Sequence, residues 1–136
     1  MEKLYTAKAT AEGGRNGHVK SSDGIIDIDV RMPKALGGDS DDFHNPELLF
    51  AAGYSACYDG ALNLVARNER HKIESKTTAN VSFCKDGEGF GLAVQLDVEV
   101  NGVDREIAQD LIEKAHQVCP YSKATRGNIE VILNLL

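Results

Sequence analysis

The sequence lacks an excess of basic residues, with 15 Lys and Arg against 21 Asp and Glu, a net charge of -6 and a pI of about 5.1. Because phosphate binding normally requires a basic patch, this balance argues against a nucleic-acid partner. The sequence also has no apolar run long enough to cross a bilayer, and residues 1–6 contain no signal-peptide core. We therefore expect no membrane insertion and a cytoplasmic protein.

Cysteine is scarce as well, with three residues at Cys57, Cys84 and Cys119. No Cys-x-x-Cys or His-x-x-x-His spacing occurs and the four histidines are scattered, so we expect no zinc or other metal site. Structural disulfides are rare in reducing cytosol. Each cysteine is therefore a small packed residue or a reactive group, and a purely packed Cys57 is an interpretation that its apolar surroundings leave open.

The chain has 136 residues, of which 42% are hydrophobic, so we expect a single domain over residues 1–136. Alternation of apolar and polar residues predicts strands, and periodic apolar residues predict helices. The predicted strands cover 5–11, 18–21, 26–32, 77–83, 92–100 and 129–135, and the predicted helices cover 46–66 and 107–118. The order β-β-β-α-β-β-α-β is an α+β fold with mainly antiparallel sheets and a central buried helix.

Three connections between these elements carry specific expectations. Asn16-Gly17 predicts a tight hairpin turn, because Asn-Gly tolerates the positive φ angles that such a turn needs. The glycine-containing acidic segment 34–44 is expected to be a mobile loop. Cys119-Pro120 should end the second helix, and the polar residues 121–128 should form a loop after it.

The central helix has unusual composition. Asn45-Pro46-Glu47 predicts its start, since Asn caps helices, Pro suits the first position and a carboxylate suits the positive end of the helix dipole. Asp59 is the only charged residue from Leu48 to Ala66. A helix that is apolar on nearly all faces must be buried on nearly all faces, which one small sheet cannot achieve. We therefore expect a homodimer with the central helices near the interface.

Arg15, Glu47 and the cysteines Cys57 and Cys119 indicate chemistry only when they are considered together. Arg15, flanked by glycines at a predicted hairpin tip, is by itself most simply a solvated turn residue. Glu47 is most simply a residue favoured by the helix dipole. His116 lies three residues before Cys119 and could contact it, although a surface histidine is the simpler interpretation. Together, a cation, a carboxylate and two cysteines in distant parts of the sequence indicate thiol chemistry.

Three segments carry a family resemblance. Residues 45–57, Asn-Pro-Glu-Leu-Leu-Phe-Ala-Ala-Gly-Tyr-Ser-Ala-Cys, resemble the signature of the organic hydroperoxide resistance (Ohr) peroxidases of the OsmC/Ohr family. Residues 119–128 resemble the second cysteine motif of these proteins, and residues 13–17 resemble the segment with their catalytic arginine. The similarity covers essentially the whole chain and favours Ohr over the OsmC branch. It departs from the usual pattern at Leu48 (usually Gln), Tyr58 (usually Phe) and Lys123 (usually Asn).

The resemblance implies roles for four residues. It implies that Cys57 is the peroxidatic cysteine, that Cys119 is the resolving cysteine, and that Arg15 pairs with Glu47. The implied fold is an intertwined α+β homodimer of the OsmC/Ohr type with active sites at the interface. Tyr58 is expected to change the polarity next to Cys57.

The resemblance also implies substrates and a reductant. Organic hydroperoxides would be reduced to alcohols through a Cys57 sulfenic acid and a Cys57–Cys119 disulfide. A dithiol would restore the thiols, and dihydrolipoyl groups on lipoylated proteins are the expected donors, with no bound cofactor. Apolar side chains next to Cys57 suit alkyl or fatty-acid hydroperoxides, and the expected substrate contacts are Leu49, Phe50 and Tyr54.

One geometric difficulty and three alternatives remain open. Glu47 and Cys57 would lie ~15 Å apart on one straight helix. Either the helix is interrupted, or the Arg15–Glu47 pair comes from the other subunit, which is the arrangement we expect. The alternatives to an Ohr peroxidase are a peroxidase of the OsmC branch, a hydrolase or acyl-transfer enzyme that uses Cys57, and a non-enzymatic dimer that binds hydrophobic ligands.

Overall fold

A computed structural model describes all residues from 1 to 136, and their contacts form two compact units, Met1–Leu49 and Phe50–Leu136. The elements follow the predicted order β-β-β-α-β-β-α-β, with one additional short helix before the last strand. The α+β class is therefore confirmed. The single domain expected for residues 1–136 stays a prediction.

The first unit contains a three-stranded antiparallel sheet of β1 (Ala9–Glu12), β2 (His18–Ser21) and β3 (Asp27–Asp29). The tight turn predicted at Asn16-Gly17 is wrong, because a short 3₁₀ helix, Gly14–Asn16, joins β1 to β2. The positive φ angles fall on Gly13 (79°) and Gly14 (58°) instead. Gly17 is needed for a different reason: a Cβ there would lie 1.7 Å from the carbonyl oxygen of Glu12.

The segment 34–44, predicted to be an acidic loop, contains local structure. It contains a 3₁₀ helix, Lys34–Leu36, and a parallel bridge joins Val30 to His44. The Arg31 guanidinium donates to the carbonyl oxygens of Gly17 and Val30 at 2.9 and 2.7 Å. These contacts fix the chain that leads from the sheet of the first unit to the helix start at residue 46.

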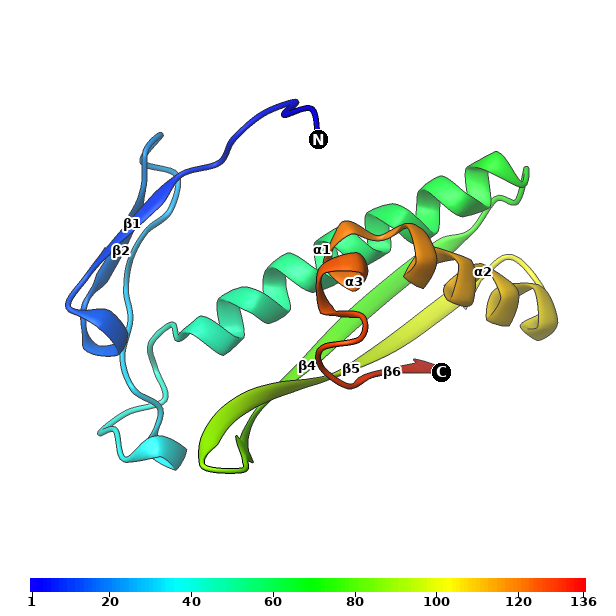
Figure 1. The fold of residues 1–136 in the computed structure, drawn as a ribbon. Helices are drawn as coiled ribbons and strands as arrows, with labels where there is room; N and C mark the ends of the chain where they lie inside the picture. Colours follow the sequence, from blue (N-terminus) through cyan, green and yellow to red (C-terminus); the bar gives the residue numbers. More distant parts are fainter. The chain divides into compact units, whose positions relative to one another are not determined.

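The second unit contains a three-stranded sheet in the order β4-β5-β6 (Figure 1). Strands β4 (Glu74–Asp86) and β5 (Gly89–Asn101) form a long antiparallel hairpin, whereas β6 (Val131–Leu135) pairs with β5 in parallel. The parallel pair arises because two helices, α2 (Arg105–Val118) and α3 (Pro120–Thr125), occupy the connection from β5 to β6. The sheets are therefore mainly antiparallel, with one parallel pair.

Helix α1 (Pro46–Asn68) begins as predicted, since the Asn45 side chain accepts a hydrogen bond from the Leu48 amide at 2.8 Å. The helix buries a single stripe, which consists of Tyr54, Tyr58, Ala61, Leu62, Val65 and Ala66. On other faces, Leu48 and Leu64 remain 51% and 44% exposed. Burial on nearly all faces is therefore not achieved within one chain, which leaves an apolar helix face uncovered.

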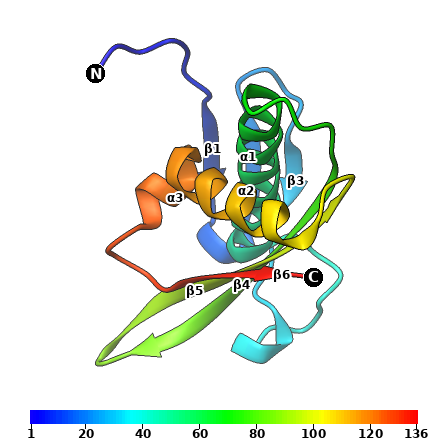
Figure 2. The same ribbon diagram turned by 90° about the vertical axis from the view of Figure 1, so that its right-hand side faces the viewer.

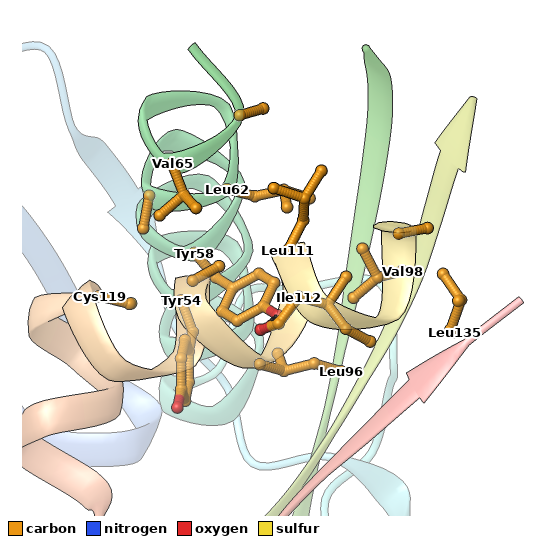
Figure 3. Packing of buried hydrophobic residues seen from close by; sticks show 14 of the residues in the cluster. Tyr54, Tyr58, Leu62, Val65, Leu96, Val98, Leu111, Ile112, Cys119 and Leu135 are labelled. Atoms are coloured by element: carbon orange, nitrogen blue, oxygen red, sulfur yellow. Dashed lines mark hydrogen bonds between the residues drawn. The ribbon is translucent and has the colours of Figure 1, made fainter. Parts of the chain in front are cut away.

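Helix α2 packs against α1 in the second unit (Figure 2). These two helices and strand β5 contribute side chains to the core of this unit (Figure 3). The apolar periodicity that predicts α2 places Ile107, Leu111, Ala115 and Val118 on one stripe, which is partly wrong: Ile112 is fully buried and Val118 is 52% exposed. The 3.6-residue period explains the difference, because it turns the buried side toward Cys119, which continues the stripe at 0% exposure.

Tyr58 belongs to this core. Its side chain is fully buried and its hydroxyl donates to the Ile112 carbonyl oxygen at 2.6 Å. Burial raises the pKa of Tyr58 well above its ordinary value, so the hydroxyl stays protonated. Its polar group therefore ties α1 to α2, and the expectation that it changes the polarity beside Cys57 is not supported by its contacts.

The loop predicted over residues 121–128 is wrong in its first part, because α3 occupies Pro120–Thr125. Cys119-Pro120 does end α2 as predicted, but Pro120 then begins a new helix, where its missing N–H costs nothing. The Cys119 residue caps α2 and α3 at once. None of the helices combines the length and the apolar character that crossing a bilayer requires.

Candidate active site

The two cysteines singled out by the sequence lie side by side, with their sulfur atoms 3.7 Å apart. Cys57 comes from the middle of α1 and is half-buried, and Cys119 comes from the corner between α2 and α3 and is fully buried. Both are free thiols. A disulfide requires a separation of about 2.05 Å, so the sulfurs would have to approach by less than about 2 Å to form one.

Backbone amides at the start of α3 contact both sulfurs. The Ser122 amide donates to the Cys119 sulfur at 3.5 Å, and the Tyr121 amide donates to the Cys57 sulfur. Burial raises the pKa of the Cys57 thiol, the Tyr121 amide opposes this increase, and the neighbouring Cys119 sulfur adds to it. The net direction is upward. With these groups alone the thiol is protonated at neutral pH, so a reactive thiolate requires an additional positive charge.

Arg15 and Glu47 form a bidentate ion pair within the first unit. Arg15 Nη1 and Nη2 lie 2.8 and 2.6 Å from the two carboxylate oxygens of Glu47. The Arg15 side chain is 31% exposed and that of Glu47 is 14% exposed. Hydrogen bonding from Arg15 lowers the pKa of Glu47, although burial opposes the change. Glu47 therefore holds the guanidinium in a fixed orientation, which a residue favoured only by the helix dipole would not do.

The residues expected to contact substrate lie within eight residues of Cys57 in the sequence but differ in accessibility. Tyr54 is fully buried, and its hydroxyl lies 2.9 Å from Ser122 Oγ and 3.1 Å from Thr125 Oγ1. Phe50 is half-buried and packs edge to face on Tyr54, with ring centroids 5.8 Å apart. Leu49 is half-buried. Their substrate contacts stay predictions, and the hydroxyl of Tyr54 is already committed to protein partners.

Tyr121 adds an aromatic ring that the sequence did not single out. Its ring lies 5.9 Å from that of Phe50 and 5.6 Å from that of Tyr54. A Cβ at Gly53 would lie 2.8 Å from the Tyr121 hydroxyl oxygen, so the glycine leaves room for this ring on α1. The three aromatic rings form a cluster on the two turns of α1 that precede Cys57.

Sequence reasoning also missed Ser122 and Thr125, which it assigned to a loop, and it treated His116 as a surface residue. His116 Nδ1 lies 2.8 Å from Ser122 Oγ, and both Ser122 and Thr125 are buried. The spacing of Ser122 and Thr125 was a usable signal. Two hydroxyl residues three apart lie on the same side of a helix, as do His116 and Cys119 on α2.

One of the two arrangements considered for Glu47 and Cys57 is excluded, and a pair from the other subunit stays a prediction. Helix α1 runs without interruption from Pro46 to Asn68, so the interrupted helix is wrong. The two residues are therefore separated by about 15 Å along the helix axis. No cluster of three or more His, Cys, Asp or Glu side chains is arranged to hold a metal ion.

Comparison with known proteins identifies the class. The chain belongs to the family of OsmC-like proteins, which it matches over residues 37–134. Within this family its relatives include organic hydroperoxide resistance proteins. It is 50% identical to OhrB of Bacillus subtilis over 134 residues, covering 97% of this chain and 98% of that protein. It is 51% identical to OhrA of the same organism over 135 residues, covering 97% and 96%.

A solved structure supports the same family assignment. The organic hydroperoxide resistance protein from Elizabethkingia anophelis superposes with a TM-score of 0.94 at 60% identity, covering 99% of this chain and 98% of that one. Identity at this level over nearly the full length confirms the resemblance of the three sequence segments to the Ohr branch.

The Arg15–Glu47 pair makes a testable prediction about stability. Because the pKa of Glu47 is lowered in the folded chain, its contribution to stability is present above its unfolded pKa and is lost as the pH falls through the folded pKa. Wild type should therefore exceed Glu47→Gln in free energy of unfolding by about 1 kcal/mol at pH 7, and the difference should shrink below about pH 4.

Urea unfolding between pH 7 and pH 3 measures this difference, with Glu88→Gln on the exposed β4–β5 turn as the control for loss of a carboxylate. A difference between wild type and Glu47→Gln that does not change with pH would contradict the ion pair.

Proposed function

We propose that this protein is a thiol-dependent peroxidase that reduces organic hydroperoxides to the corresponding alcohols. The observation that carries the proposal is the 3.7 Å separation of the Cys57 and Cys119 sulfurs, both free and both contacted by amides of α3. Two cysteines that only filled space would not need to meet across two helices. The organic hydroperoxide resistance proteins among its relatives support the same chemistry.

The proposed reaction has three balanced steps. The Cys57 thiolate attacks one oxygen of the hydroperoxide ROOH, the O–O bond breaks, and the departing alkoxide takes a proton to become the alcohol ROH. Cys57 is left as a sulfenic acid. The Cys119 thiol then displaces its hydroxyl group, which forms the Cys57–Cys119 disulfide and releases water. A dithiol reduces this disulfide and is itself oxidised to a cyclic disulfide, and we propose dihydrolipoyl groups of lipoylated proteins as that donor.

Arg15 supplies the positive charge that the half-buried Cys57 needs. A guanidinium remains charged when partly buried, favours the thiolate and stabilises negative charge on the departing alkoxide. Glu47 orients it through the bidentate pair. Because α1 separates Glu47 from Cys57 of the same chain, we propose that Arg15 and Glu47 of the partner subunit complete the site.

The second copy is supported by the face of α1 that one chain leaves uncovered. Along this face the side chains are exposed at every fourth position, which applies to Leu48, Ala52, Ala56, Gly60 and Leu64. All five are apolar or small enough to allow close helix packing, and none is charged. A homodimer would bury this stripe, and a hydrophobic surface beside Cys57 suits alkyl or fatty-acid hydroperoxides.

The hydrolase alternative is less well supported. A thiol hydrolase needs a histidine base next to Cys57. The groups that act on the Cys57 thiol are the Tyr121 amide and the Cys119 sulfur, and His116 Nδ1 is engaged by Ser122. The ligand-binding alternative assigns no purpose to the contact between the sulfurs.

Steady-state consumption of cumene hydroperoxide tests the activity and the reductant together. We expect turnover with dihydrolipoamide, slower turnover with dithiothreitol, and little with thioredoxin. Cys57→Ser should abolish turnover with every reductant, because the nucleophile is gone. Cys84→Ser is the matched control and should retain the wild-type rate. Equal consumption by wild type and Cys57→Ser would refute the peroxidase and leave the ligand-binding dimer as the better account.

Mixed dimers test the arrangement across subunits. One subunit carries Cys57→Ser and the other carries Arg15→Ala. If Arg15 serves Cys57 of the partner, one of the two sites keeps both groups, and the mixed dimer should have about half of wild-type activity. If both groups act within one chain, each site lacks one of them. Activity no greater than that of the Arg15→Ala homodimer would then contradict the composite site.

A further inference from the structure

A chain of polar side chains, buried except for the half-buried His116, lies beside the cysteine pair and is not used by the reaction proposed above. It begins at His116 on α2, passes through Ser122 on α3 and reaches Tyr54 on α1, where the contacts are 2.8 and 2.9 Å. Tyr54 also contacts Thr125 on α3 at 3.1 Å, and Thr125 Oγ1 donates to the Ser122 carbonyl oxygen at 3.2 Å. Three helices thus meet through one set of hydrogen bonds.

Counting hydrogens fixes the direction of every bond in this chain. The Ser122 carbonyl oxygen can only accept, so the Thr125 hydroxyl donates to it. Thr125 then has no hydrogen left for Tyr54, so Tyr54 donates to Thr125. By the same reasoning Ser122 donates to Tyr54.

The three hydroxyl hydrogens are then used, and four contacts exist. The fourth hydrogen must come from His116 Nδ1, which therefore donates to Ser122 Oγ. Burial and the nearby Arg126 lower the pKa of His116, so at neutral pH the ring is uncharged with its hydrogen on Nδ1. Arg126 also donates to the His116 carbonyl oxygen at 2.5 Å, which adds a second link between α2 and the end of α3.

This hydrogen-bonded chain of His116, Ser122, Tyr54 and Thr125, called the relay below, lies next to the two sulfurs. Tyr54 precedes Cys57 by one helical turn on α1, and Ser122 follows Cys119 by three residues. The Tyr54–Ser122 hydrogen bond and the Cys57–Cys119 contact therefore lie next to each other, and both connect α1 to the start of α3. Ser122 belongs to both, because its hydroxyl is in the relay while its amide donates to the Cys119 sulfur.

We propose that the relay His116–Ser122–Tyr54–Thr125 is a positioning device that holds α3 against α1 and so keeps the Cys119 sulfur within reach of Cys57. His116 and Ser122 are positioning residues in this account, because neither touches the reacting atoms. The purpose assigned to this positioning, rapid capture of the Cys57 sulfenic acid, rests on the proposed peroxidase function. The positioning itself does not, since any oxidant that joins the two thiols would reveal it.

The test measures the effective concentration of the two thiols for each other in the full-length chain carrying Cys84→Ser. Equilibration in glutathione redox buffers gives the fraction of Cys57–Cys119 disulfide by intact mass under acid quench. Ser122→Ala removes the hydroxyl but keeps the backbone amide on Cys119, and His116→Leu removes the donor. Each should lower the effective concentration by about tenfold, the usual effect of losing one buried hydrogen bond.

A conservative variant and a control separate positioning from general loss of stability. His116→Asn places an amide donor near the position of Nδ1 and should restore most of the effective concentration lost in His116→Leu. Ser82→Ala, on the exposed face of β4, should leave it unchanged. If Ser122→Ala does not fold, the comparison of His116→Leu with His116→Asn decides the question.

Two results would overturn the proposal: a wild-type effective concentration in the folded His116→Leu and Ser122→Ala variants, or equal losses in His116→Leu and His116→Asn. Failure of the proposed function gives a different result. Wild type would then consume no hydroperoxide through Cys57, while the redox equilibria would still report whether the relay positions the thiols.

Discussion

The approach of two sulfur atoms across the packing of α1 and α3 is the constraint on which the rest of the site depends. It exists because Cys57 lies beside the buried stripe of α1 and because α2 ends where Cys119 completes its own buried stripe. Pro120 stops α2 and immediately starts α3, whose first amides face the sulfurs. The core that folds the second unit is therefore also the scaffold that brings the thiols together.

Packing brings the Cys57 and Cys119 sulfurs together but makes the Cys57 thiol harder to ionise. The same packing that holds Cys57 near Cys119 raises the pKa of its thiol. A thiolate therefore needs a cation, and the cation must remain charged in a partly buried place. The Arg15–Glu47 pair has the required chemistry and a fixed orientation. Since α1 is uninterrupted between Glu47 and Cys57, we propose that catalysis depends on dimerisation, with the sulfurs from one chain and the charge from its partner.

Much of the fold followed from local patterns in the sequence. The alternation in β4 and β5 was correct because each strand buries one face only, and Asn45-Pro46 marked the start of α1 by capping chemistry that acts over a few residues. Errors arose where tertiary contacts decide. Gly17 is glycine because the Glu12 carbonyl approaches it closely, and not because of a hairpin turn. Helix α3 is short and polar in sequence, and the hydroxyls of Ser122 and Thr125 find hydrogen-bond partners on other helices, Tyr54 of α1 for both and His116 of α2 for Ser122.

In the candidate site too, some features could be predicted from the sequence and others depend on tertiary contacts. The resemblance pointed to Cys57, Cys119, Arg15 and Glu47, and the contacts within each pair are those that their chemistry requires. The positions of His116 and Tyr54 in a hydrogen-bonded relay had no counterpart in sequence spacing, because the partners lie 6 and 68 residues from Ser122 along the chain and meet only after three helices have packed.

The central claim is that Cys57 and Cys119 form a redox pair without large rearrangement. Its most direct test adds one equivalent of linoleic acid hydroperoxide per chain to the reduced protein, followed by alkylation and non-reducing peptide mapping. The account predicts loss of two thiols per chain, a peptide disulfide joining Cys57 to Cys119, and a free Cys84. Retention of all three thiols, or oxidation of Cys57 without a bond to Cys119, would contradict it.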